Sequence, residues 1–221
     1  MENSAASYET RVFSTGQVDT RRANLHDLFN ALVWLAFPRT KAALNARHVA
    51  RLAQDGARRG SLRDTLTLID EGGVIVACAE NFLAEAESLI RLFRWQELFW
   101  ERRVEMLRNS RFVLVGHSAY EKALKPYPGI TCKALFIATP PALIDGPSVE
   151  LTQWLDDAAE KWITNLPDTA APRQMAPLPV FGYPGWLAEA KGPGFYADRR
   201  WFRAAPAPSG RGSAEKLERV P

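Results

Sequence analysis

The chain has little cysteine and little histidine. Only two cysteines and three histidines occur among its 221 residues. Cys78 and Cys132 lie far apart, each inside an apolar run, and no CxxC motif or Cys/His spacing of a zinc site is present. The sequence therefore predicts two buried, reduced thiols rather than a disulfide, which is typical of a reducing compartment.

Long hydrophobic runs are also missing. The longest strongly apolar stretch runs from Ala31 to Phe37, whereas a membrane-spanning helix needs about 20 such residues. The first residues, MENSAASYETRVF, lack the basic start and apolar centre of a signal peptide. A net charge of +3 is too small to indicate nucleic-acid binding by itself. We expect a soluble, cytoplasmic protein without a membrane partner.

What the chain does have is apolar and aromatic residues. Hydrophobic residues make up 47% of the chain and include seven Trp and eleven Phe, which is enough for a sizeable core. We expect one globular domain over residues 1–203. It would begin with an arm over 1–23, containing a short strand at Tyr8–Phe13, and end in an extended wrap over 167–203. Nine of the fifteen prolines fall at or after Pro167. Residues 204–221 are predicted to be a disordered tail.

The local patterns predict a mixture of helices and strands. Asn24 and Thr40 are suitable N-caps for a helical hairpin over 25–37 and 41–54, interrupted by Pro38. The runs TLTLID and VIVACA, joined by Glu-Gly-Gly, favour a β-hairpin. Further expected elements are helices over 80–108 with a break near Arg94, 119–125 and 148–166, and strands over 112–115 and 131–139.

The two later strands, with about 13 intervening residues that include a helix, suggest a parallel β-α-β crossover. Together the elements predict an α+β or α/β fold: a helical hairpin and further helices packed on a small mixed sheet.

Polar side chains recur at helical spacing in the first helix of the hairpin. His26, Asp27 and Asn30 share one face, while the remaining positions are apolar nearly all round. Such a helix is usually buried. Buried polar groups without partners cost about 1–3 kcal/mol each, so we expect this set to be hydrogen-bonded. Capping alone can explain Asp27, and a structural hydrogen bond can explain His26.

The second helix of the hairpin carries a similar stripe. Lys41, Asn45 and His48 lie at i, i+4 and i+7. If both stripes face inward, they converge near Pro38 with Arg39. The alternative is that the second stripe is the solvent face of an amphipathic helix.

The segment FVLVGHSAY contains the third histidine, His117. Strand, Gly-His-Ser and helix resemble a nucleophile elbow, but a bulky Tyr120 follows the serine and no histidine occurs after His117. A capping box of Ser118 and Glu121 is the better explanation. His117 would then stand beside free backbone N–H groups, which favour anions.

A local basic stretch is the remaining feature. It consists of Arg47, Arg51, Arg58, Arg59 and Arg63. A solvated helix face and loop explain it better than a phosphate-binding surface.

Several long segments resemble one family. They are YETRVFSTGQVDTR, NLHDLFNALVWLAFPRTKAALNARH, RDTLTLIDEGG, VGHSAYEKAL and PLPVFGYPGW with FYADRRWFR. Over about residues 8–203 the chain resembles an uncharacterised bacterial family, domain of unknown function 3025. The resemblance implies one domain and no established activity. Members tend to carry alanine where Ser118 stands, which weakens any nucleophile role. They also carry more residues before Tyr8, so part of the N-terminal region is expected to be reduced.

The leading functional hypothesis is a pocket for a small anionic or phosphorylated ligand. His26, His48 and His117 would serve as catalytic acid–base groups, and the ligand-binding residues would be Asp27, Asn30, Arg39, Lys41 and Asn45. No cofactor is expected, although a divalent metal held by His26, Asp27 and His117 is a lower-ranked variant.

Two alternatives are kept. One is a non-enzymatic module that binds protein or nucleic acid through the Arg47–Arg63 stretch. In the other, the polar hairpin only braces the aromatic residues of the Pro-rich wrap.

Overall fold

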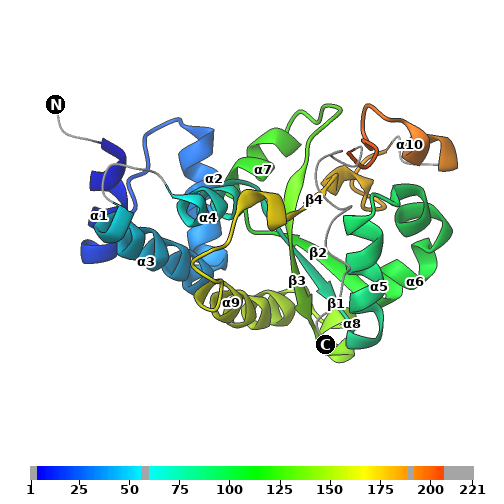
Figure 1. Ribbon diagram of the computed structural model, residues 1–221, viewed down its shortest axis with the longest axis horizontal. Helices are drawn as coiled ribbons and strands as arrows, with labels where there is room; N and C mark the ends of the chain where they lie inside the picture. Colours follow the sequence, from blue (N-terminus) through cyan, green and yellow to red (C-terminus); the bar gives the residue numbers. More distant parts are fainter. Residues whose placement is uncertain (1–3, 56–59, 189–191, 207–221) are drawn as a thin grey trace, which may run out of the picture.

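A four-stranded mixed sheet forms the centre of the protein, with helices against both faces (Figure 1). The computed structural model describes residues 4–55, 60–188 and 192–206. The strands are ordered β2-β1-β3-β4, with bounds β1 Gly73–Cys78, β2 Ser110–Leu114, β3 Cys132–Ala138 and β4 Ala176–Leu178. The predicted α+β class with a small mixed sheet is confirmed.

Strand β1 is the central element, and it is buried along its whole length. It pairs parallel with β3, where Ile75 lies beside Leu135, and antiparallel with β2. Because side chains alternate along a strand, Ile75 packs into one hydrophobic cluster and Val74 and Val76 into the other. The GVIVAC run is apolar throughout because both of its faces are covered.

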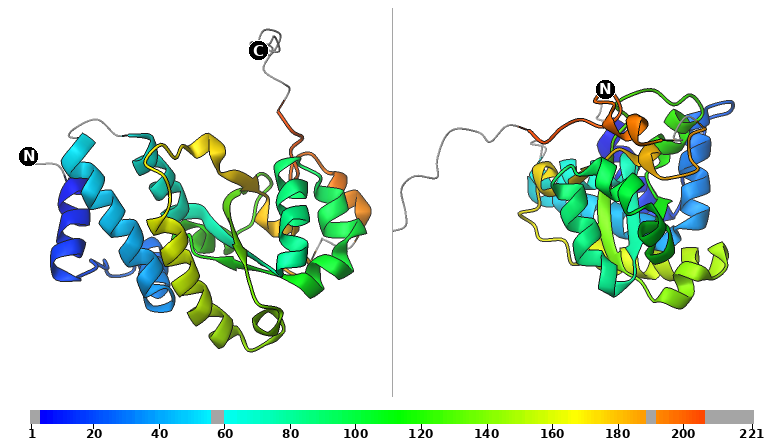
Figure 2. Two further views of the ribbon diagram at one scale, coloured as in Figure 1. Left: turned by 60° about the horizontal axis from the view of Figure 1, so that its bottom comes forward. Right: turned by 90° about the vertical axis from the view of Figure 1, so that its right-hand side faces the viewer.

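Helices from the N-terminal half lie on one side of the sheet, together with two later helices. They are α1 Ser4–Thr15, α2 Leu25–Ala36, α3 Pro38–Asp55, α4 Ser61–Gly72, α7 His117–Ala123 and α9 Ser148–Thr164. Figure 2 (left) shows α3 and α9 side by side. Among the described residues no helix is long and apolar enough to cross a membrane.

The other face of the sheet is covered by the middle and the end of the chain. These elements are α5 Glu80–Arg91, a π-helical turn Glu97–Glu101, α6 Arg103–Asn109, the short α8 Pro141–Asp145 at the end of β3, and α10 Pro193–Ala197. The predicted break near Arg94 is confirmed, since α5 ends at Arg91 and Phe93 has a left-handed φ of 59°.

Two predicted strands are helices instead. Residues 8–13 belong to α1, and TLTLID belongs to α4, so the predicted β-hairpin is absent from the described part of the chain. In α4 the buried residues Leu62, Leu66 and Ile69 recur at i, i+4 and i+7. The helical spacing lets all three side chains pack in the core. The free energy of burying them outweighs the preference of threonine and isoleucine for strands.

The predicted β-α-β crossover is also wrong. Strands β2 and β3 are not neighbours, because β1 lies between them. Since β1 is antiparallel to β2 and parallel to β3, the chain from β2 through α7 reverses direction rather than crossing over. The parallel pair is β1 and β3, and the connection between them contains α5, α6, β2 and α7.

The Pro-rich wrap packs away from the helical hairpin. A 3₁₀ turn at Pro172–Gln174 precedes the edge strand β4, and a second 3₁₀ turn at Val180–Gly182 and helix α10 follow it, so the wrap is not a fully extended chain. Tyr183, Tyr196 and Phe202 are buried in the cluster beside α5, where Phe202 lies 6.2 Å from Phe99 between ring centroids. The idea that the hairpin's polar residues brace these aromatics is therefore wrong. Residues 207–221 of the predicted disordered tail lie outside the described residues, while 204–206 are described and exposed.

Gly116 fixes where α7 begins, and this gives a stability prediction. A Cβ at Gly116 would lie 2.4 Å from the backbone nitrogens of Gly72 and Gly73. We expect Gly116→Ala to lower the free energy of unfolding by about 1–3 kcal/mol or more, because the backbone must shift. Gly72→Ala is the matched control, since nothing lies within 4 Å of its Cβ position, and it should be neutral or slightly stabilising. Equal urea midpoints for both variants would contradict this.

Candidate functional site

Two histidines that are 91 positions apart in the sequence meet between α2 and α7. The Nε2 atoms of His26 and His117 are 3.0 Å apart, and their ring centroids are 4.5 Å apart. The side chain of Asn24 accepts a hydrogen bond from the backbone N–H of Asp27 at 2.9 Å and caps the start of α2, as predicted. His26 therefore lies in the first turn of this helix. His26 is partly open, with 42% of its side chain exposed, whereas only 6% of the His117 side chain is exposed.

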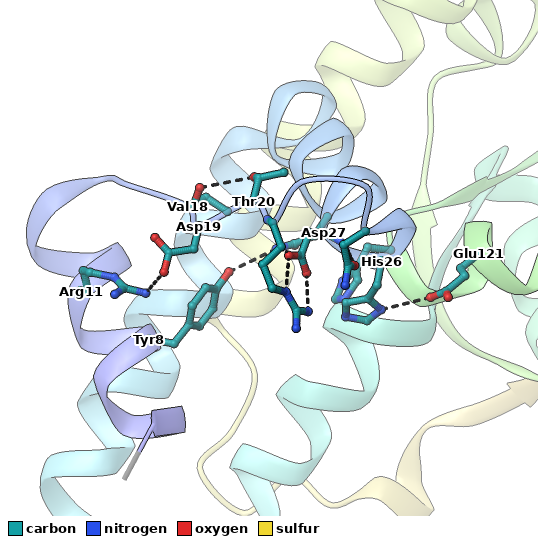
Figure 3. A network of polar contacts seen from close by, with 12 residues as sticks. Tyr8, Arg11, Val18, Asp19, Thr20, His26, Asp27 and Glu121 are labelled. Carbon is teal, nitrogen blue, oxygen red and sulfur yellow. Dashed lines mark hydrogen bonds and ion pairs between the residues drawn. The ribbon is translucent and has the colours of Figure 1, made fainter. Parts of the chain in front are cut away.

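The outer nitrogens of both rings face groups that only accept hydrogen bonds. Nδ1 of His26 lies 3.2 Å from the carboxylate of Glu121, which Figure 3 shows reaching across from α7. Nδ1 of His117 lies 2.7 Å from the backbone oxygen of Asp70. Each Nδ1 must therefore carry a hydrogen when Glu121 is ionised. Two neutral rings would then present lone pairs to each other, and one additional proton between the Nε2 atoms makes this contact a hydrogen bond.

His117 is held in place by the backbone around it. Gly116 packs against Gly72 and Gly73, which brings the start of α7 to the end of α4, where Asp70 lies. The N-cap of α7 is Gly116, and no side chain caps the helix, so the predicted capping box is wrong. Its Glu121 binds His26 instead. Burial lowers the pKa of His117, while the Asp70 carboxylate opposes this effect.

A buried lysine connects the histidine pair to the rest of the hairpin. Lys41 Nζ contacts the carboxylate of Asp70 and donates to Asn30 Oδ1 at 2.9 Å. Asn30 Nδ2 in turn lies 3.2 Å from the hydroxyl of Tyr8 on α1. Burial raises the pKa of Asp70, but the charges of Lys41 and His117 outweigh it and keep that pKa below its usual value.

A hollow of about 450 Å³, a size suited to a small molecule, lies between α1, α2, α4 and α7, and its wall includes His26, His117 and Asp70. Its acidic residues are Glu9, Asp19, Asp27, Asp70 and Glu71, and its arginines are Arg11 and Arg21. The arginines are already paired, Arg11 with Asp19 and Arg21 with Asp27, as Figure 3 shows for the first pair. The wall therefore holds five acidic residues and two arginines, so acidic groups outnumber basic ones.

The whole described chain falls within one family. The sequence matches "Protein of unknown function (DUF3025)" over residues 1–205. The chain belongs to this family. No curated protein and no solved structure matches this DUF3025 chain. The predicted resemblance is thus confirmed, and the extent of a single domain over 1–203 stays a prediction.

The structure of this DUF3025 protein brings most of the predicted site residues to the hollow, but not all of them. His26, Asp27, Asn30, His48 and His117 line it. Lys41 lies just behind, joined to Asp70, and Asn45 is close by because it donates to Glu9 on α1.

Arg39 lies elsewhere. It extends from the start of α3 toward α9 and pairs with Asp157 at 3.1 Å. Placing it in the pocket was wrong, because in a helix residues 39 and 41 point in directions about 200° apart.

The described residues do not bring the side chains of the expected metal site together. In the described part of the chain, no group of three or more His, Cys, Asp or Glu side chains is placed to hold a metal ion. The expected trio of His26, Asp27 and His117 does not assemble, because both oxygens of Asp27 bind Arg21, at 2.7 and 2.9 Å. Cys78 and Cys132 are free and buried as predicted, and burial raises the pKa of each thiol to about 12.

The basic stretch is used inside the molecule. Arg47 donates to the backbone oxygens of Thr164 and Leu166, and Arg51 binds Asp55. The Arg47 contacts hold α3 against the end of α9, and the Arg51 pair lies within α3, so the two arginines do not form a free phosphate-binding face. Arg58 and Arg59 lie outside the described residues.

Reasoning from sequence missed several residues of the site. Glu121 was assigned to a cap, and Tyr8 and Glu9 were assigned to an arm. Asp70 is the last residue of TLTLID, a run whose residue types predict a strand of a β-hairpin rather than part of a site. A signal existed for Asp70, since the period of Leu62, Leu66 and Ile69 indicates a helix whose last turn contains it.

Proposed function

We propose that the hollow binds a small polar molecule and that the His26–His117 pair acts on it as a general acid–base. The observation that carries this is the contact of two Nε2 atoms at 3.0 Å, with both Nδ1 atoms facing acceptors. A hydrogen bond between the two Nε2 atoms needs a proton on one of them, and imidazole is the side chain best suited to proton transfer near neutral pH.

His26 is the member of the pair that a ligand reaches, because His117 is buried behind it. A ligand group that displaces Glu121 from Nδ1 of His26 can take the proton held there. Once Nδ1 of His26 has lost its proton, it can accept one from a ligand, and His26 then passes the proton on its Nε2 to Nε2 of His117. Asp70 then keeps His117 oriented through its backbone oxygen. The pair thus acts as a proton relay, and the Glu121 carboxylate favours the form in which Nδ1 of His26 carries a proton.

The charges favour a neutral or cationic ligand over the anionic one expected from sequence. Lys41 was expected to neutralise an anion, but it is buried and paired with Asp70. The two arginines of the wall are paired as well. Because five acidic residues and only two arginines line the hollow, its wall disfavours an anionic ligand, which argues against phosphate as the main recognition element.

Loss of either histidine is expected to slow the reaction. The purified protein would be incubated with a library of small metabolites, and consumption followed by mass spectrometry. For any compound that is consumed, His26→Gln and His117→Gln should each react about 10²–10⁴ times more slowly. Lys122→Gln, an exposed change on the same helix α7, is the matched control and should react at the wild-type rate.

Wild-type turnover by both histidine variants would refute the proposal. The protonation of the pair can be checked separately by long-range ¹H–¹⁵N spectra of the imidazole rings. Hydrogens on both Nδ1 atoms are expected, and an unprotonated Nδ1 on His117 would contradict the proposed relay.

A further inference from the structure

Helix α2 turns its polar face toward the protein and its apolar face toward solvent, the opposite of an ordinary surface helix. Its polar residues His26, Asp27 and Asn30 face the protein, where they are hydrogen-bonded. Its leucines face outward, with exposed fractions of 51% for Leu25, 46% for Leu28, 48% for Leu32 and 80% for Leu35. The sequence pattern predicted a helix buried all round, which is wrong for this face. Figure 2 (right) shows α2 at the outer edge of the molecule.

The four leucines are spaced by three, four and three residues. This is the a-d-a-d pattern of a coiled-coil seam over two heptads. The positions between and beside them on the outer face are Ala31 and Ala36, so no charged residue borders the seam within the helix. Leucines at a and d pack into the gaps of a facing helix with the same pattern. The seam is therefore complementary to itself, and it carries no charge that would select a different, oppositely charged partner.

The neighbouring helix extends this apolar face. Helix α7 packs on α2 through the stacked rings of Phe29 and Tyr120, 5.9 Å apart, and through His26 and Glu121. Leu124 follows Tyr120 and Glu121 at helical spacing, just past the end of α7, and it is exposed. It therefore lies on the side of α7 that faces α2.

We propose that a second copy of this chain docks on the leucine seam of α2, forming a two-fold symmetric dimer. A two-fold axis brings identical patches together, which suits a self-complementary seam. Five partly exposed side chains provide on the order of a few hundred Å², compared with about 800 Å² per partner in a standard interface. The dimer is accordingly weak, and its population depends on concentration. This inference does not rest on the proposed function.

Sedimentation velocity of the full chain over about 1–500 μM tests the proposal, since mass action shifts a weak dimer across that range. We expect the wild-type protein to move from monomer to dimer. The double variant Leu28→Lys/Leu35→Lys should remain monomeric, with dimerisation weakened by more than about 100-fold, because four lysines would meet at the seam. Its thermal midpoint should match that of the wild type, since both leucines are solvent-exposed in the monomer.

The control is Leu92→Lys/Val149→Lys, which removes two comparably exposed apolar residues, 60% and 67%, from other surfaces. It should dimerise like the wild type. A wild-type protein that stays monomeric at the highest concentration overturns the proposal. A dimer that survives the α2 variant, or is lost in the control, overturns it too. Binding of the wild-type monomer to neutral phosphatidylcholine vesicles, abolished in the α2 variant, would instead assign the seam to lipid.

Discussion

Replacing Lys41 with methionine is expected to lower the free energy of unfolding by about 2–4 kcal/mol at pH 7, since it removes the buried partner of Asp70, whose side chain is 27% exposed to the hollow. Lys41 is buried in α3, and its ammonium contacts Asp70 and Asn30. Methionine replaces the aliphatic stem but leaves the Asp70 carboxylate without its main partner. Urea unfolding at pH 7 measures the loss. Lys125→Met, at an exposed position, should change stability by no more than about 0.5 kcal/mol.

The same variant should change the response to acid. In the folded wild type the pKa of Asp70 lies below its ordinary value of 3.8, so its ionised form contributes stability above that pH. This contribution is lost as the pH falls below 3.8 through the lower folded-state value. Without Lys41 the pKa of Asp70 is no longer lowered by the ammonium. The stability difference between wild type and Lys41→Met should therefore shrink between pH 7 and pH 3, and a constant difference would contradict the assignment.

Asp156→Ala is expected to lower the free energy of unfolding by about 2–4 kcal/mol. Asp156 lies in α9 and accepts the backbone N–H groups of Arg39 and Thr40, at 3.0 and 2.8 Å, and the Thr40 hydroxyl at 2.8 Å. It thus satisfies the first N–H groups of α3 from another helix. Alanine leaves the N–H groups of Arg39 and Thr40 without this acceptor, while the Thr40 hydroxyl keeps the Asp156 backbone oxygen at 3.3 Å. Each buried donor that loses its partner costs about 1–3 kcal/mol.

Two neighbouring changes make this prediction specific. Asp156→Asn keeps one acceptor oxygen and should lose roughly half as much stability as Asp156→Ala. Asp157→Ala removes only the surface pair with Arg39 and should cost no more than about 1 kcal/mol. Denaturant midpoints for the three variants decide the matter. If Asp157→Ala were as destabilising as Asp156→Ala, the capping role would be wrong.

The helical hairpin shows where prediction from local sequence succeeds. Asn24 caps α2 as expected, and Pro38 ends it, because both effects act over a few residues. The second helix begins at Pro38 rather than after Thr40. Thr40 is a good N-cap by type, but Asp156, 116 positions away, supplies the acceptor instead. No local pattern indicates that contact.

Strand and helix assignments failed where burial had to be known. TLTLID contains residues that favour strands, yet it forms the last part of α4, since Leu66 and Ile69 must reach the same cluster beneath the sheet. The leucines of α2 were expected to be buried because most apolar helices are. Their exposure depends on the neighbours that the fold places around α2, and the sequence of the helix does not contain this information.

The sequence by itself determined several of the residues that line the hollow, the mixed α+β class, the caps and breaks of α2, the free thiols and the family. These follow from residue types and from spacings within one or two helical turns. Tertiary structure alone decided that His26 meets His117, that Lys41 is neutralised by Asp70 and that Arg39 faces α9. Such pairings join residues from 29 to 117 positions apart, so they depend on how whole helices pack against the sheet.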